Sequence, residues 1–216
     1  MSRQLLFRFL VPRKARRGKK LGRPKKAGSG VRHVARERVR HYHPQLVTVR
    51  LQPGLPSLRR KAVLELLWEI FADARERLGM RLCQWTVLSN HLHFIVEAED
   101  SRALSRGMNG LLVRIARRVN RLLGRTGRFF ADRYHACALK SPREVYNRLG
   151  YVLKNATHHG IRVGRIDDFS SAPWFDGWTE DIEILNGPDQ TPIARPRTWL
   201  LNTGWLKHHG PLPLSP

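Results

Sequence analysis

Two adjacent strand patterns constrain the fold of this chain most strongly. Residues Arg81–Leu88 (RLCQWTVL) and His91–Ala98 (HLHFIVEA) are rich in apolar, β-branched and aromatic side chains, and only Ser89 and Asn90 separate them. A connection of two polar residues has room only for a tight turn. The two strands are therefore expected to pair as an antiparallel hairpin.

Further strand and helix patterns surround this hairpin. They predict, in order, a strand at Leu46–Leu51, a helix from Ser57 to about Leu78, the hairpin, a helix from Ser101 to Leu123, a short strand near Tyr134–Leu139 and a helix from Ser141 to about His158. The resulting order β-α-β-β-α-β-α indicates an α+β fold, an antiparallel sheet covered by helices.

The charge of the chain indicates a polyanionic partner. Forty Lys and Arg residues against 17 Asp and Glu give a net charge of +23 among 216 residues, and nucleic acid is the leading candidate. No apolar run approaches the roughly 20 residues of a membrane span, so no membrane partner is expected. Two cysteines, Cys83 and Cys137, are too few for a disulfide scaffold or a thiolate zinc site, which favours a reducing, cytoplasmic location. With DNA as the partner, the expected location is nucleoid-associated.

The charge is concentrated at the N-terminus. Residues 3–40 hold fifteen Lys and Arg and one acid, and Arg13–Gly30 has almost no large apolar residue, so residues 1–45 are predicted to be a largely disordered DNA-binding arm. Within it, Lys19–Lys26 (KKLGRPKK) resembles an AT-hook, in which Arg23 would enter an A·T-rich minor groove; a phosphate-contacting tail without sequence preference is the alternative. Residues 46–164 are then predicted to be the folded domain, and 165–216 a Trp- and Pro-rich tail that packs on it.

The His91-Leu92-His93 sequence is the strongest chemical signal. Alternate residues of a strand share a face, so both imidazoles point one way while Leu92, Phe94 and Val96 point into the core. Two adjacent imidazoles can bind a divalent metal if one or two oxygen ligands complete the site. The alternative is one hydrogen-bonded surface histidine beside an unrelated one.

A tyrosine on the last predicted helix is the candidate nucleophile. On a helical wheel, Tyr151 and Asn155 lie four residues apart on a face roughly 130° from the apolar stripe. A tyrosine there, beside an amide, could attack an electrophile next to a metal ligand; a tyrosine at the domain rim is the alternative. Tyr146 points to a different side and is a weaker candidate.

Basic side chains of the folded part are predicted to grip nucleic acid. With Phe129, Phe130 and Tyr134 interleaved, they could supply phosphate contacts and base stacking to a single strand. The expected contact residues are Arg114, Arg117, Arg118, Arg121, Arg128 and Arg133.

Three motifs in order resemble one family. Val87–Val96 (VLSNHLHFIV) looks like the "PNHLHLLV" signature of the IS200-like (Y1, HUH) transposases and REP-associated tyrosine transposases; Phe130–His135 (FADRYH) looks like their "W/F-x-x-R-Y/F" stretch, and Tyr151–Asn155 (YVLKN) matches their "Y-I-x-x-N" motif. The resemblance covers roughly residues 46–160. Ser89 and Ala156 depart from it, each standing where a proline is common.

The resemblance implies a fold and a chemistry. The fold would be the ferredoxin- or RRM-like HUH fold, with His91, His93 and Asn155 holding Mg²⁺ or Mn²⁺ and no small-molecule cofactor. Tyr151 would cleave single-stranded or hairpin DNA, leaving a 5′-phosphotyrosine that a second 3′-hydroxyl can resolve. Family members occur as monomers and as homodimers.

Two other functions fit parts of the pattern. A domesticated relative could bind the same DNA without cutting it. A metal-dependent hydrolase of small phosphoesters could use His91 and His93 without a covalent step, but a small substrate leaves the basic arm unexplained.

Overall fold

The computed structural model describes residues 37–158, 160–161, 164–182 and 191–214, apart from the side chain of residue 158. All of them belong to one compact unit, His33–Pro216. Nearly all of the predicted arm, including Arg23, lies outside the described residues. No helix within the described ranges is long and apolar enough to cross a membrane.

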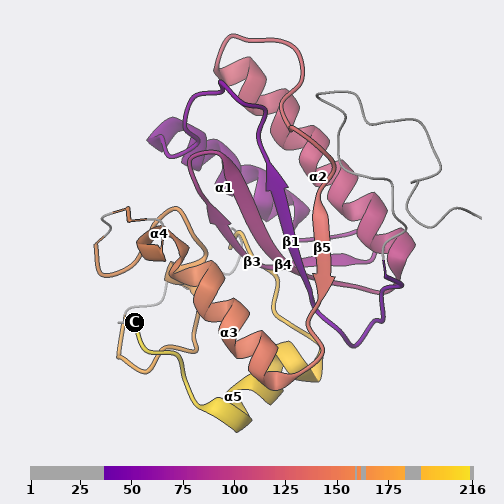
Figure 1. Ribbon diagram of the computed structural model, residues 1–216, viewed down its shortest axis with the longest axis vertical. Coiled ribbons are helices and arrows are strands. Elements are labelled where there is room, and N and C mark those ends of the chain that lie inside the picture. The colour runs from indigo at the N-terminus through magenta and orange to yellow at the C-terminus, as the bar shows by residue number, and fades with distance from the viewer. Residues whose placement is uncertain (1–36, 159, 162–163, 183–190, 215–216) are drawn as a thin grey trace, which may run out of the picture. The chain divides into compact units, whose positions relative to one another are not determined.

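A five-stranded antiparallel sheet organises the described chain. Its strands, in the order β2-β3-β4-β1-β5, are β1 (Gln45–Arg50), β2 (Glu76–Arg77), β3 (Met80–Val87), β4 (His91–Ala98) and β5 (His135–Ala138). Figure 1 shows β1 and β5 side by side, with β4 and β3 following on the other side of β1. The predicted α+β fold, with its antiparallel hairpin, is confirmed.

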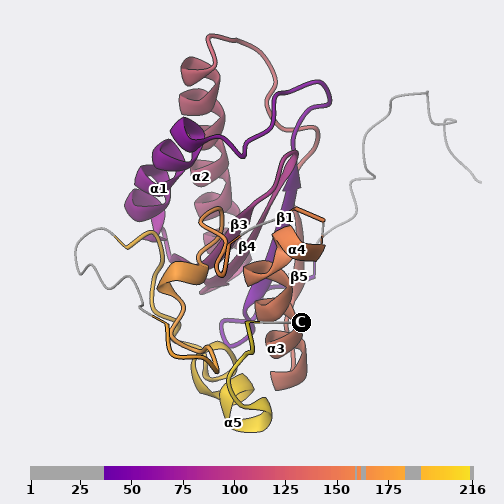
Figure 2. The ribbon, with the colours of Figure 1, turned by 90° about the vertical axis from the view of Figure 1, so that its left-hand side faces the viewer.

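Helices cover both faces of the sheet. The helices α1 (Lys61–Ala74) and α2 (Ser101–Leu122) pack on one face, against Leu92, Phe94 and Val96. The helix α3 (Pro142–Leu153) packs on the other, where Ile95 and Cys83 belong to its apolar cluster. Figure 2 shows the sheet edge-on between these layers. Alternation along β4 therefore separates two cores, and the histidines lie on the α3 side.

Local capping explains where two of the helices begin. Asp100 caps α2, because its Oδ1 accepts a hydrogen bond from the Ala103 backbone N–H at 2.7 Å. Ser141 caps α3 by accepting from the Glu144 N–H at 3.2 Å, with Pro142 at the first helical position.

The first helix is shorter than predicted. It begins at Lys61 rather than Ser57, and it ends at Ala74 because the next residues pair with β3 as strand β2. Leu78 and Gly79 close this second hairpin with positive φ angles of 56° and 74°. A positive φ is easy for glycine and strained for leucine. Strand β2 was not predicted because the helical pattern of the sequence continues through it to Leu78.

The last helix is interrupted where a continuous one was predicted. It stops at Leu153, and a short helix α4 (Asn155–His158) follows Lys154. The Leu153 carbonyl accepts from the Ser170 hydroxyl at 3.4 Å, while Thr157 N–H bonds the Lys154 carbonyl. The Ser170 side chain, from the C-terminal region, therefore contacts the backbone where α3 ends.

Segments after residue 164 pack on the sheet and on α3. Ser171 N–H donates to the Trp85 carbonyl at 2.9 Å, and the Ser171 hydroxyl contacts Gln84 Oε1 at 2.5 Å. The region also contains the 3₁₀ turn η1 (Ala172–Trp174), the π-helical turn η2 (Leu200–Gly204) and the helix α5 (Trp205–His209). The turn η2 and the helix α5 form one continuous helical segment. It was not predicted, because this part of the sequence has no helical periodicity.

A buried ion pair joins α1, β3 and this C-terminal region. The Arg59 guanidinium contacts the Asp167 carboxylate at 2.7 and 3.0 Å, donates to the Val87 carbonyl at 3.0 Å and stacks 4.4 Å from the Phe169 ring centroid. Only 13% of the Arg59 side chain and 5% of the Asp167 side chain are exposed. Val87 ends the strand that leads to the turn before His91, so the pair supports the base of that turn.

Replacing Asp167 with alanine is expected to lower the free energy of unfolding by about 3–5 kcal/mol, because it leaves a buried guanidinium without its counter-charge. Urea unfolding followed by circular dichroism measures the change. Glu69→Ala is the matched control, since it breaks the exposed Arg118–Glu69 pair and should cost less than about 1 kcal/mol. Equal losses in both variants would show that Asp167 contributes no more than a surface charge.

Candidate active site

Two histidines stand side by side on β4. The ring centroids of His91 and His93 are 4.8 Å apart and the rings are nearly perpendicular. His91 is half-buried, and His93 is 4% exposed. The pair therefore occupies a protected position on the α3 face, at the end of the sheet where β4 begins.

Each histidine has an oxygen beside its Nδ1 atom. His93 Nδ1 lies 2.8 Å from Thr48 Oγ1, and His91 Nδ1 lies 2.7 Å from Asn90 Oδ1. An amide oxygen only accepts, so His91 Nδ1–H donates and its Nε2 keeps a lone pair. Two tautomers of His93 satisfy its contacts, and the one protonated at Nδ1 likewise leaves Nε2 as an electron-pair donor.

The candidate nucleophile lies against this pair. Tyr151, from α3, places its phenolic oxygen 3.3 Å from His93 Nε2, and the two ring centroids are 5.2 Å apart. The Arg148 guanidinium carbon lies 5.8 Å from the Tyr151 ring centroid. Tyr146 faces elsewhere, and its ring lies near Trp205 and His209. The structure thus brings Tyr151, and not Tyr146, to the histidines.

Asn155 has an unusual environment. Its side chain is fully buried, and neither Oδ1 nor Nδ2 has a hydrogen-bond partner among the described residues. A buried amide normally makes such bonds, and leaving one unsatisfied costs about 1–3 kcal/mol. Because the helix breaks at Lys154, Asn155 begins α4 and is not stacked over Tyr151 in one continuous helix as the wheel predicted.

A cationic side chain beside the histidines escaped the sequence interpretation. Arg50 pairs with His91 across β1 and β4, as Thr48 pairs with His93, so both lie on the histidine face. Arg50 is exposed. The alternation of Leu46–Leu51 carried the signal, because Thr48 and Arg50 interrupt the apolar residues at every second position.

The predicted DNA-contacting arginines do not gather at this site. Arg114, Arg117, Arg118 and Arg121 belong to α2, which packs on the opposite face of the sheet, and Arg118 pairs with Glu69 at 2.6 Å. Arg128 donates to the carbonyls of Phe130 and Ala131 within its own loop. Arg133 is exposed just before β5.

Burial alters the pKa of two side chains, Cys83 and Lys154. It raises the pKa of the Cys83 thiol well above its usual range, and the nearby Glu97 carboxylate adds to the effect, so Cys83 is a protonated core residue. Burial lowers the pKa of Lys154, against the opposing effect of Glu180. Lys154 donates to the Pro213 carbonyl at 3.2 Å, which joins the end of α3 to the C-terminal residues.

The donor set fits a divalent cation only if an amide takes part. Within the described ranges, no group of three or more His, Cys, Asp or Glu side chains could hold a metal ion. Imidazole nitrogens and the unsatisfied Asn155 oxygen are both types of donor that a divalent cation can accept.

A family model and a solved structure are each similar to part of this chain. The family model "Transposase IS200 like" matches residues 55–152. A solved structure of a REP-associated tyrosine transposase bound to a REP hairpin is similar, with a TM-score of 0.50 and 15% sequence identity, covering 60% of this chain and 75% of that one. No curated protein matches the chain.

The matched residues include both histidines and Tyr151, and the similar structure shares the fold. Residues 55–152, a little under half of the chain, are therefore similar to the IS200-like transposases.

Proposed function

We propose that this protein cleaves and rejoins single-stranded DNA through a covalent 5′-phosphotyrosine, with a divalent metal. One observation carries the proposal: the Tyr151 hydroxyl lies 3.3 Å from His93 Nε2, on the face that also holds His91. A nucleophile beside a pair of metal-ligand side chains is the arrangement that a phosphoryl transfer of this kind requires.

The reaction exchanges one phosphodiester for another. The Tyr151 oxygen attacks the scissile phosphorus, the bond to the 3′ oxygen breaks, and the phenolic proton is balanced by the proton on the released 3′-hydroxyl. Because the phosphotyrosine conserves the ester, a second 3′-hydroxyl can attack it and restore Tyr151 without ATP. Arg50 and Arg148 lie where they would contact the DNA backbone.

His91, His93 and Asn155 would hold the cation, which is Mg²⁺ or Mn²⁺. Bound there, it would polarise the scissile phosphate and stabilise the charge on its oxygens. Asn90 and Thr48 would orient the two rings: each would accept a hydrogen bond from Nδ1–H, which leaves Nε2 available as a metal ligand.

The expected substrate is single-stranded DNA carrying a hairpin. The similar solved transposase is bound to a REP hairpin, and a net charge of +23 suits any nucleic acid. DNA as substrate would place the protein at the nucleoid. A protein that bound such DNA without cutting it would be the domesticated relative, and the first experiment below separates the two.

Tyr151→Phe is expected to abolish the covalent adduct, since it removes the attacking oxygen. The purified protein is incubated with labelled hairpin-forming single strands and Mn²⁺, and denaturing gels detect a protein–DNA adduct. Tyr146→Phe is the matched control from the same helix and should retain the adduct. An adduct that survives in Tyr151→Phe would refute the assignment, and binding without any adduct in the wild type would indicate the domesticated function.

Thr48→Val is expected to weaken Mn²⁺ binding by about 10- to 100-fold, because the partner that orients His93 is lost while the side-chain shape is kept. Calorimetric titration of the DNA-free protein with Mn²⁺ measures this directly. Thr48→Ser retains the hydroxyl and should bind as the wild type does. Equal affinities in all three proteins would exclude a role for Thr48 in metal binding.

Arg50→Gln is expected to slow adduct formation by about tenfold or more, since Arg50 lies beside His91 and would contact the reacting strand. Arg117→Gln removes the same charge from α2, on the other face of the sheet, and should leave the single-turnover rate unchanged. A larger effect at Arg117 than at Arg50 would mean that the strand approaches from the α2 side.

A further inference from the structure

A cavity lies at the end of the sheet far from the histidines. Its volume is about 470 Å³, and it is lined by the β2–β3 hairpin, the end of β4 and residues 197–199. Seven residue steps along β4 separate His91 from Ala98, a distance of about 23 Å. The cavity is therefore separate from the site around Tyr151.

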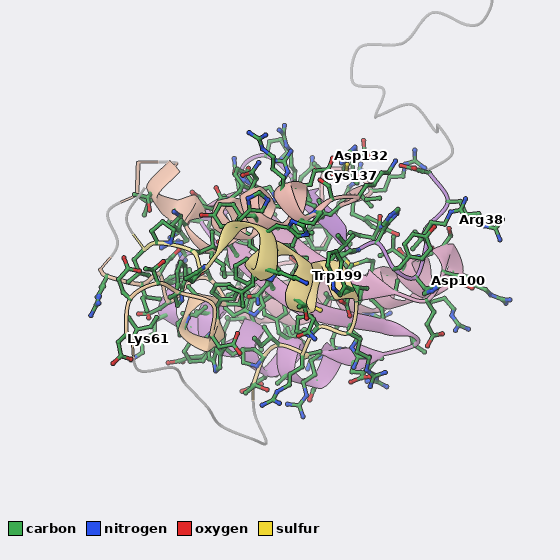
Figure 3. All side chains as sticks on the ribbon, turned by 90° about the horizontal axis from the view of Figure 1, so that it is seen from below. Arg38, Lys61, Asp100, Asp132, Cys137 and Trp199 are labelled. Carbon is green, nitrogen blue, oxygen red and sulfur yellow. The ribbon has the colours of Figure 1, made fainter. Side chains whose placement is uncertain are left out.

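Large apolar side chains are unusually exposed at this cavity. Tyr42 is 48% exposed, Leu78 51% and Trp199 53%, and all three line it. Figure 3 shows Trp199 beside the yellow C-terminal helical segment. Scattered exposed apolar residues need no explanation, but three around one cavity indicate a binding surface.

The indole of Trp199 is held in a fixed position. A Cβ added at Gly204 would lie 2.7 Å from the Trp199 ring, so the ring lies directly on the glycine backbone. The preceding residue is anchored too, because Thr198 donates from its N–H and its hydroxyl to the buried Glu97 carboxylate, each at 2.8 Å. Trp199 is thus a preorganised, exposed aromatic platform.

Charged groups of both signs surround the platform, because Glu76, Glu97 and Glu99 line the cavity together with Arg77, Arg81 and Arg197. Arg81 and Arg197 share the Glu76 carboxylate at 2.9 and 3.0 Å, and the Arg197 side chain remains 71% exposed. Arg77 is exposed on β2. A flat aromatic surface with arginines at its rim is the combination that binds single-stranded nucleic acid, through base stacking and phosphate contacts.

We propose that this cavity binds an unpaired nucleobase of the DNA, stacked on Trp199 and Tyr42, with Arg77 and Arg197 contacting the flanking phosphates. The inference rests on the proposed DNA-binding function and extends it to a second contact, at the opposite end of β4 from His91. The volume suits a base, and the exposed Arg77 and Arg197 side chains favour a ligand that carries phosphates.

The test measures the affinity of the full chain for a fluorescein-labelled oligothymidylate by anisotropy. Trp199→Ala and Tyr42→Ala are each expected to weaken binding between about fivefold and a hundredfold, the range for losing one stacked base. Leu206→Ala, which removes an exposed apolar side chain from the same helical segment but outside this cavity, should not weaken it. Trp199→Phe retains a stacking ring and should bind more tightly than Trp199→Ala.

A second measurement isolates stacking from folding. Wild type should lose affinity when the oligonucleotide is made abasic, and Trp199→Ala should lose less. The proposal is overturned if the variants bind as the wild type does, or if Trp199→Ala and wild type suffer the same abasic loss. It is also overturned if sedimentation shows that Trp199→Ala only dissociates a dimer, which would make the cavity a self-association surface.

These outcomes are independent of the cleavage chemistry. If no adduct forms at Tyr151 but Trp199→Ala still weakens DNA binding, the proposed reaction fails and the base site stands. If the adduct forms and Trp199 has no effect on binding, the base site fails alone.

Discussion

The register between β1 and β4 decides what surrounds the two histidines. Antiparallel pairing sets Thr48 opposite His93 and Arg50 opposite His91, and a shift by one residue would replace both with buried valines. The same register directs Leu92, Phe94 and Val96 into the core under α1 and α2. Hydrophobic burial on the α1 and α2 side of the sheet therefore fixes which side chains surround the histidines on the α3 side. The position of Tyr151 over the histidines is set separately, by α3.

Placing Tyr151 depends on residues distant in sequence. The end of α3 accepts the Ser170 hydroxyl at Leu153, and Ser171 pairs with the Trp85 backbone on β3. Arg59 and Asp167 connect the same region to the start of α1. The C-terminal region is accordingly part of the framework that supports Tyr151, although the family match ends at residue 152.

The arrangement of charge follows from the layered fold. The helix α2 must turn its apolar stripe toward the sheet, so its arginines project from the face opposite the histidines. Arg50 and Arg148 instead belong to the elements that build the site. A DNA molecule that engaged both sets would have to extend around the edge of the sheet. The base site proposed beside Trp199 would add a further point of contact along the sheet.

The sequence by itself determined the antiparallel hairpin, the common face of His91 and His93, and the amphipathic α2, because each depends on local periodicity or a short connection. It also indicated Tyr151 and Asn155 through motif spacing. Only the tertiary structure decided which residues meet. Strand pairing brought Thr48 and Arg50 to the histidines, the β2–β3 hairpin shortened α1, and the Leu153 carbonyl bonded to Ser170 beside the helix break that separates Asn155 from α3. These are contacts between residues far apart in the chain, and no local pattern encodes them.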